Sequence, residues 1–317
     1  MAYGYAALVG VLWCAVRLTD RIDVATLIGF GPRWLAAVPL VPLTAWMIVA
    51  VPKRQMAPIG GVLALSATAL LIGVLDLRLG LGRTPGPPSV RVMTQNLGGS
   101  AVDADVLGEL MVREQVDVAA FQECPFYDNS PTRPGWQFYY GGDLCLLSRY
   151  PFTVLDIHDP DNEWRRGGRT PIRFEIRGPV PFQVVNVHFQ TVRGGLTALW
   201  GGRGEGLGGF EDNRREASQE SSSTRARVRA LDGPFLVVGD FNLPVESAFY
   251  RDNWADLRNM FSRCGRGFGH TKFTPLFGIR IDHVIASGHW ECTDARVLSS
   301  PYGGDHAPLI VDLNLTS

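Results

Sequence analysis

The sequence predicts an α/β domain that is preceded by about three transmembrane helices. The first 80 or so residues contain three long apolar windows. The remainder alternates short apolar runs with helical patterns, which is typical of α/β domains. Several of the apolar runs also end on an acid, an amide or a histidine. The 317 residues are enough for one large domain plus an N-terminal appendage.

The three apolar windows are residues 2–16, 34–51 and 57–75. A helix needs about 20 mostly apolar residues to cross the hydrocarbon core, so the second and third windows fit well and the first is marginal. A secretory signal is the rival interpretation of the first window, which lacks a basic n-region and an A-x-A-like cleavage site. Burial in a soluble core is the other alternative, and two uncharged windows of this length argue against it.

The distribution of charge mildly favours an extracytoplasmic position for the chain after the third window. Lys53 and Arg54 lie in the short loop between the second and third windows, and positively charged loops tend to stay in the cytoplasm. Arginines also lie in the loop after the first window and in the segment after the third window, which weakens this preference for an extracytoplasmic position. We expect a multi-pass protein of the cell membrane. Its expected parts are a membrane domain at 1–80, a Pro- and Gly-rich linker at 81–89 and a catalytic domain at 90–317.

From residue 90 onward, strand and helix patterns are separated by loops. The segment 193–211 is rich in glycine and reads as a loop, and the polar segment after it reads as a solvated helix with Asp212 as a candidate cap. The expected elements are a strand at 90–96, a helix at 101–115, a strand at 116–122, a hairpin within 135–151, two strands joined by a turn at 178–179, a helix at 212–231 and a strand that ends at Gly239.

The segment FLVVGDFNLP at 235–244 combines a buried strand with two polar residues at its end. Asp240 is an anion that can hold a metal or take a proton, and the Asn242 amide can donate to a developing oxyanion. The two are two residues apart, so they project from the same side of an extended chain. Taken alone, the segment is equally compatible with a polar turn that caps the strand.

Other segments of the chain show the same pattern of an apolar run next to polar residues. In strands, adjacent residues face opposite sides, so Asp282 and His283 should point in opposite directions. The residues concerned are Asn96, Glu123, Asn186 with His188, Asp282 with His283, and Asp305 with His306.

The order Asn, Glu, His, Asp-x-Asn, Asp, Asp-His resembles that of the endonuclease/exonuclease/phosphatase superfamily over roughly residues 89–315. The resemblance implies a DNase I-like, four-layered sandwich of two facing β-sheets flanked by helices, and hydrolysis of phosphate esters. The membrane segment before this domain is similar to that of VanJ-like teicoplanin-resistance proteins. That similarity implies an extracytoplasmic hydrolase with a link to glycopeptide resistance or cell-wall intermediates.

The resemblance implies a metal site and a substrate contact. Glu123 is expected to bind the metal with Asn96 beside it and Asp305 as a second oxygen donor, and oxygen ligands favour Mg²⁺ or Mn²⁺. Arg169 is expected to contact the substrate phosphate. The alternatives are a surface glutamate for Glu123 and a solvated hairpin charge for Arg169.

The resemblance also implies catalytic roles. Asp240 would orient and deprotonate the attacking water, and Asn242 would hold a non-bridging phosphate oxygen. Asp282 would fix the tautomer of His306, which would act on the phosphate as acid, base or charge stabiliser. His188 would contact the phosphate, and a packed strand histidine is the alternative for it.

Composition limits the substrate and the compartment only partly. The net charge of −1 and the pI near 6.6 indicate no general basic surface, so nucleic acid is an admissible partner that is not favoured. The five cysteines show no metal-ligand spacing. Cys264 and Cys292 would form a disulfide in an exported domain, and buried free thiols fit the sequence equally well.

These observations together predict a membrane-anchored, divalent-metal-dependent phosphodiesterase or phosphatase. A tethered site meets lipid-borne molecules at high effective concentration, which favours a lipid-linked phosphate ester as substrate. A membrane-tethered surface nuclease is the first alternative, and a non-catalytic membrane scaffold is the second. No protein partner is indicated by the sequence.

Overall fold

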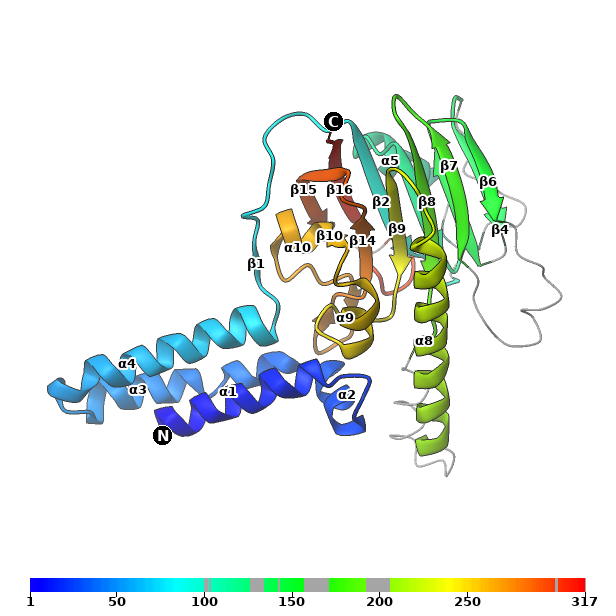
Figure 1. The fold of residues 1–317 in the computed structure, drawn as a ribbon. Coiled ribbons are helices and arrows are strands. Elements are labelled where there is room, and N and C mark those ends of the chain that lie inside the picture. Colours follow the sequence, from blue (N-terminus) through cyan, green and yellow to red (C-terminus); the bar gives the residue numbers. More distant parts are fainter. Residues whose placement is uncertain are drawn as a thin grey trace.

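The computed structural model describes residues 1–99, 102, 104–125, 134–141, 143–156, 171–191, 206–299 and 302–316, with only the backbone described at 206–210. Two six-stranded sheets face each other within this part of the chain (Figure 1). The first sheet runs in the order β15 (Trp290–Val297), β16 (Leu309–Leu315), β2 (Val90–Asn96), β3 (Val118–Gln122), β5 (Leu144–Ser148), β4 (Gln137–Gly141). The second runs in the order β10 (Arg258–Asn259), β14 (Asp282–Ala286), β9 (Phe235–Asp240), β8 (Pro181–His188), β7 (Ile172–Arg177), β6 (Phe152–Asp156).

Strand alternation builds the layers. In β9, Leu236 and Val238 face the opposite sheet, whereas Val237 between them faces the outer helices. The helix α5 (Ala104–Arg113) covers the outer face of the first sheet with Leu107 and Leu110. The helices α8 (Gly206–Val228) and α9 (Ala248–Trp254) cover the second sheet. The described residues therefore form the expected helix–sheet–sheet–helix sandwich.

Each sheet contains one parallel pair at its centre, β2 with β3 and β8 with β9, and antiparallel pairs elsewhere. The carboxyl ends of both parallel pairs lie at the same edge of the sandwich. The antiparallel strands β14 and β16 begin at this edge, because Asp282 pairs with Asp240 and Leu309 pairs with Thr94. The topology thus gathers the polar ends of distant segments at one edge of the two sheets.

The N-terminal helices form a separate bundle that projects from the sandwich (Figure 1). Its elements are α1 (Ala2–Arg17), α2 (Asp23–Gly29), η1 (Arg33–Ala37), α3 (Leu40–Ala50), α4 (Lys53–Thr68) and η2 (Ala69–Val74). Two stretches in the described part of the chain, Arg33–Ala50 and Lys53–Val74, are long and apolar enough to cross a membrane. The Ala2–Arg17 helix is apolar but shorter, so the third expected span stays a prediction.

Ion pairs attach the bundle to the sandwich. Arg33 at the start of one apolar stretch contacts the Glu246 carboxylate at 2.7 Å, and both side chains are about one-tenth exposed. Asp76, just after the other stretch, is paired with Arg280 and Arg78. Residues 78–79 form the short strand β1 (Arg78–Leu79), which pairs with β11 (Arg266–Gly267) beside the sandwich.

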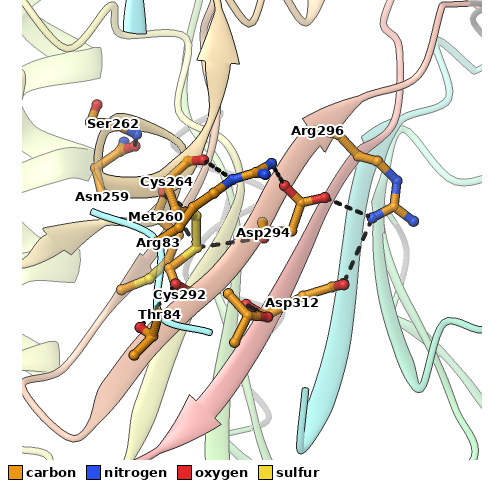
Figure 2. The surroundings of a disulfide bond; sticks show 11 residues. Arg83, Thr84, Asn259, Met260, Ser262, Cys264, Cys292, Asp294, Arg296 and Asp312 are labelled. Atoms are coloured by element: carbon orange, nitrogen blue, oxygen red, sulfur yellow. Dashed lines mark hydrogen bonds and ion pairs between the residues drawn. A yellow bond between two sulfur atoms is a disulfide. The ribbon is translucent and has the colours of Figure 1, made fainter. Parts of the chain in front are cut away.

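The segment expected to be a linker runs along the sandwich beside a disulfide (Figure 2). Cys264 at the end of α10 (Met260–Cys264) is bonded to Cys292 in β15. Arg83 donates from Nε to the Cys264 carbonyl at 3.1 Å, and the Thr84 amide donates to the Cys292 carbonyl at 2.9 Å. The disulfide that the sequence left open is therefore formed, and it lies where the linker joins the domain.

Two sequence-based expectations require correction. The helix α8 begins at Gly206, so residues 206–211 of the expected glycine-rich loop are helical, and residues 192–205 lie outside the described part. Asp212 therefore lies inside the helix, where it pairs with Arg215, and it does not cap the N-terminus. A second disulfide, Cys124–Cys145, was not expected, because the strands β3 and β5 that bring these cysteines together pair only in the folded sheet.

Candidate active site

The strand ends bring most of the predicted site residues to one edge. Asn96 ends β2, and Glu123 follows β3 directly. His188 and Asp240 end β8 and β9 and are register partners across that parallel pair. His306 precedes β16, and its backbone forms a bridge with Lys272. Because these residues all lie where strands start or stop, the side chains can leave the sheets without disrupting strand pairing.

The backbone is unusual where the site residues leave the strands. Glu123 and Asn242 have φ values of 48° and 50°, which non-glycine residues seldom adopt. Gly239 has a φ of 138°, and a Cβ at this position would lie 2.0 Å from the Val187 carbonyl oxygen. Only glycine lets β9 approach β8 so closely, so the GD pair of the sequence motif is required by the packing that positions Asp240.

Asn96 lies at the centre of the carboxylate cluster. Its Nδ2 donates to Glu123 Oε1 at 3.1 Å and to Asp240 Oδ2 at 3.0 Å, and its Oδ1 accepts from the Gly98 amide at 2.8 Å. Asn96 and Asp240 are almost completely buried, whereas about a third of the Glu123 side chain is exposed. Glu123 is therefore the carboxylate of this group that a solvent-borne cation or substrate reaches most easily.

His188 lies between carboxylates. Its Nδ1 is 2.6 Å from Asp143 Oδ2, and its Nε2 is 3.6 Å from Glu123 Oε1 and 3.8 Å from Asp240 Oδ2. A carboxylate at Nδ1 fixes the tautomer that carries a proton there and orients the ring toward the site. Asp143 was missed from the sequence, because an aspartate in a Gly-Gly-Asp turn is more often a turn former than a site residue.

His306 is held by a second carboxylate. Its Nδ1 is 2.8 Å from Asp282 Oδ2, and its Nε2 is 3.9 Å from Asp240 Oδ2. Burial alone would lower the pKa of His306, but the Asp282 and Asp240 carboxylates raise that pKa to about 9. The imidazole is therefore poised to be cationic, with Nδ1–H donated to Asp282 and Nε2 directed at the site.

Lys272 is a second cation at this site that sequence reasoning missed. Its Nζ is 2.7 Å from Asp305 Oδ1 and 2.9 Å from His306 Nε2. Both side chains line the same pocket, where each nitrogen can donate a hydrogen bond to an anion that enters it. Lys272 and His306 therefore mark a place for an anionic group such as a phosphate. A lone lysine in the segment HTKFT gave no indication of this, because surface lysines are common.

The predictions made for Asn242, His283 and Arg169 compare differently with the structure. The Asn242 amide donates from Nδ2 to the Phe189 carbonyl, and its backbone N–H donates to Asp240 Oδ1, both at 2.9 Å. Asn242 thus holds the Asp240 carboxylate, and its predicted contact with a phosphate oxygen stays a prediction. His283 faces the core, as alternation predicted, and its Nε2 is 2.8 Å from the Leu243 carbonyl. Arg169 lies outside the described residues.

A pocket of about 310 Å³ lies at the edge of the sandwich where the candidate site residues gather. Among the residues predicted from the sequence, Asn96, Glu123, Asp305 and His306 line it. Lys272 joins them, together with the backbone of two glycines. The lining residues are Asn96, Gly98, Glu123, Lys272, Gly304, Asp305 and His306.

The donor set at this edge fits a divalent metal at one of two positions. Glu123 presents carboxylate oxygen to the pocket, with Asn96 next to it, but the Asn96 amide now offers Nδ2 and would have to turn its oxygen inward to become a ligand. Asp240, Asp282 and His306 also offer ligand atoms within 4.8 Å of one another. We favour the Glu123 position, because Glu123 is partly exposed and lines the pocket, whereas Asp240 and Asp282 are buried and Asp282 Oδ2 is already held by His306 Nδ1.

A two-sheet sandwich with acids, amides and imidazoles gathered around one pocket defines the DNase I-like class of phosphoesterase domains. The chain belongs to the endonuclease/exonuclease/phosphatase family, whose model matches residues 93–306. Members of this family hydrolyse phosphoester bonds and depend on divalent metals. Comparison with curated protein sequences gives no significant match.

Solved structures show the same fold at low sequence identity. A 3′-phosphatase from Neisseria bound to a product DNA hairpin is 18% identical, with 71% of this chain and 99% of that chain covered and a TM-score of 0.52. An AP endonuclease from Archaeoglobus fulgidus is 13% identical, with 71% and 100% covered and a TM-score of 0.52. A mannosyl-6-phosphatase from Bacteroides thetaiotaomicron is 16% identical, with 71% and 100% covered and a TM-score of 0.51.

Proposed function

We propose that this protein is a membrane-anchored, divalent-metal-dependent phosphoesterase that acts on a lipid-linked or cell-envelope phosphate ester. The observation that supports this best is the attachment of the N-terminal bundle at the active-site edge. Glu246, which pairs with Arg33, follows Asn242 by four residues, and Arg280, which pairs with Asp76, precedes Asp282 by two residues. An anchor fixed at this edge holds the catalytic pocket close to the membrane surface.

The chain's own residues divide the work of phosphoester hydrolysis. A bound Mg²⁺ or Mn²⁺ would neutralise phosphate charge and stabilise the leaving oxygen, with Glu123 and Asn96 holding it and Asp305 nearby. Asp240, fixed by Asn242 and Asn96, orients a water and takes its proton. An aspartate with two such donors keeps one geometry, which favours in-line attack.

The two histidines act on the phosphate beside Asp240, because their Nε2 atoms lie 3.8 and 3.9 Å from Asp240 Oδ2. His306, with its Nδ1–H held by Asp282, places a cationic Nε2 where a non-bridging oxygen gains charge. Lys272 adds a second positive charge to the same pocket. His188, whose Nδ1–H is held by Asp143, presents its Nε2 to the same site and contacts the substrate there.

The two disulfides of the described residues support an extracytoplasmic catalytic domain. Cys124–Cys145 and Cys264–Cys292 both lie in the sandwich, and disulfides persist mainly in oxidising compartments. Together with the mild charge preference of Lys53 and Arg54, they favour the outer face of a cell membrane. We include in this proposal a link to glycopeptide resistance or cell-wall lipid intermediates, which rests on the resemblance of the sequence to VanJ-like proteins.

A membrane-tethered nuclease is the second candidate. The Neisseria structure holds a DNA product, and the shared fold makes nucleic acid a reasonable substrate to test. The near-neutral net charge disfavours it, because non-specific DNA binding depends on many phosphate contacts from basic residues. A non-catalytic scaffold is the third, and the presence of every described candidate site residue at one edge argues against it.

The deciding experiment is a substrate panel on the full-length protein in detergent. Polyprenyl pyrophosphate, phospholipid and DNA are compared with and without EDTA, and Glu123→Gln serves as the matched inactive control. We expect metal-dependent release of phosphate from a lipid substrate that EDTA and the Glu123→Gln substitution both abolish. Cleavage of DNA alone would establish the nuclease instead. Reporter fusions at the C-terminus locate the domain relative to the membrane.

A further inference from the structure

A short hairpin connects the active-site pocket to the N-terminal bundle. It consists of β12 (Lys272–Phe273) and β13 (Gly278–Ile279) with a tight turn between them. The turn is closed by hydrogen bonds, because the Thr274 amide donates to the Phe277 carbonyl at 2.9 Å and the Phe277 amide donates to Thr274 Oγ1 at 3.1 Å. The hairpin therefore has a defined shape and is not a loose loop.

The base of the hairpin is joined to the site. The Phe273 amide donates to the Asp305 carbonyl at 2.9 Å, and Thr271 Oγ1 accepts from the Asp282 amide at 3.1 Å. Lys272 forms the backbone bridge with His306 and places its Nζ in the pocket. A displacement of the hairpin would therefore move Lys272, and it would disturb Asp305 and His306, to which the hairpin backbone is bonded.

The hairpin exposes two apolar side chains, Leu276 in its turn and Phe273 in β12. Leu276 is 72% exposed and Phe273 is 41% exposed. The Leu276 carbonyl accepts a hydrogen bond from Trp34 Nε1 at 3.1 Å. Trp34 is the second residue of the apolar stretch Arg33–Ala50, and its neighbours Leu35 and Val38 are also exposed. The hairpin and the bundle thus meet at exposed apolar side chains, which we call the hairpin patch (Trp34, Leu35, Val38, Phe273, Leu276).

We propose that the hairpin patch contacts the lipid surface and that the hairpin selects membrane-borne phosphate esters for the pocket that contains Lys272. A membrane is the occupant because the patch is continuous with a stretch long and apolar enough to span a bilayer, and tryptophan concentrates at membrane interfaces. The hairpin is about 10 Å long, which compares with a headgroup layer of roughly 5–8 Å on each side of the hydrocarbon core. A tip at the hydrocarbon boundary therefore holds the pocket at the level of lipid phosphates. This inference rests on the proposed function.

The chain offers a matched control for this surface. Val180 is 40% exposed, and it lies in the turn before β8, at the end of that strand opposite to His188. We compare a double variant, which carries both Phe273→Ser and Leu276→Ser, with the single variant Val180→Ser. Both are full-length proteins reconstituted in vesicles. Both variants keep the backbone groups that bond to Trp34 and Asp305.

The activity test uses two substrates with the same scissile group. One is bis(p-nitrophenyl) phosphate in solution, and the other is a p-nitrophenyl phosphodiester of a diacyl lipid in phosphatidylglycerol/phosphatidylethanolamine vesicles. We expect the double variant to lose about ten-fold in kcat/KM on the vesicle substrate, with less than two-fold change on the soluble one. Equal losses on both substrates, no loss on either, or the same loss in Val180→Ser would overturn the inference.

A second measurement is independent of catalysis. An environment-sensitive fluorophore is attached at Leu276→Cys, or at Val180→Cys as control, in a Cys14→Ser background that removes the free cysteine. We expect a blue shift of the emission on reconstitution at position 276 alone. No shift at 276 overturns the membrane contact even if the enzyme is active. A shift without hydrolysis of either substrate leaves the contact supported and contradicts the proposed activity.

Discussion

Gly239 offers the sharpest test of how the active-site edge is built. It lies in β9 immediately before Asp240 and pairs with Val187 of the parallel strand β8. Its φ of 138° is unfavourable for a residue with a side chain, and an added Cβ would lie 2.0 Å from the Val187 carbonyl oxygen. The Gly239→Ala substitution therefore introduces both backbone strain and a collision between two backbones at the centre of a sheet.

The magnitude follows from these two effects. The strain costs about 1–3 kcal/mol. Real Cβ atoms essentially never come closer than 3.0 Å, so the strands must separate by the difference between 2.0 and 3.0 Å or more. A shift of about 1 Å breaks hydrogen bonds of the β8–β9 ladder, each worth about 1–3 kcal/mol when left unsatisfied in the core. We expect Gly239→Ala to destabilise the protein by about 3–6 kcal/mol.

The assay is thermal unfolding of the detergent-purified protein, with Gly233→Ala as control. Gly233 also has a positive φ, 77°, but its Cβ would meet nothing within 4 Å, so only strain of about 1–2 kcal/mol remains. For a domain of this size, about 1 kcal/mol corresponds to 2–4 °C, so Gly239→Ala should lower the Tm by roughly 6–24 °C. If the two variants melted together, the close approach of β8 and β9 would not be what positions Asp240.

Three further outcomes are expected. Asp143→Asn should reduce phosphoesterase kcat about 10–100-fold, because it removes the carboxylate that orients His188. The Tm should change little, because the Asp143 side chain is partly exposed. The stability of the domain should fall as the pH drops from about 6.5 toward 3, by up to about 1.4 kcal/mol per pH unit, because burial lowers the pKa of His283 to about 3. Glu246→Gln should weaken docking of the N-terminal bundle by about 3–5 kcal/mol, seen as faster amide exchange at residues 33–38, because Arg33 is left buried without its carboxylate.

Each of these has its own control. An unchanged kcat in Asp143→Asn would mean that His188 needs no orienting group. For the acid response, the unfolded chain binds a proton at His283 below about pH 6.5 whereas the folded chain does not until about pH 3, so His283→Gln should flatten the dependence. Asp252→Asn breaks the exposed pair with Arg21 and should change exchange very little. Equal effects of Glu246→Gln and Asp252→Asn would contradict the role of the buried pair.

Strand ends and apolar windows are local properties, and the sequence by itself predicted them well. The strand at 90–96, the hairpin within 135–151 and the turn at 178–179 match, and the strand expected to end at Gly239 runs one residue further to Asp240. Period-two patterns and turn residues act over a few positions, so they can be recognised in the sequence. The alternation of side chains along a strand also predicted that Asp282 and His283 point in opposite directions, and in the structure Asp282 faces the site and His283 faces the core. Two apolar stretches long enough to span a membrane were also visible from composition alone.

Tertiary structure alone decided which residues gather at the candidate active site. Asp143 and Lys272 lie in segments whose local patterns resemble a turn and a solvated surface, and they reach the site only because β5 pairs with β3 and the 272–279 hairpin pairs with His306. The Cys124–Cys145 disulfide and the Arg33–Glu246 pair join residues 21 and 213 positions apart. A linear pattern encodes periodicity over one element, whereas contacts between distant elements depend on how the sheets pack, and that packing fixed the orientation of the pocket toward the N-terminal bundle.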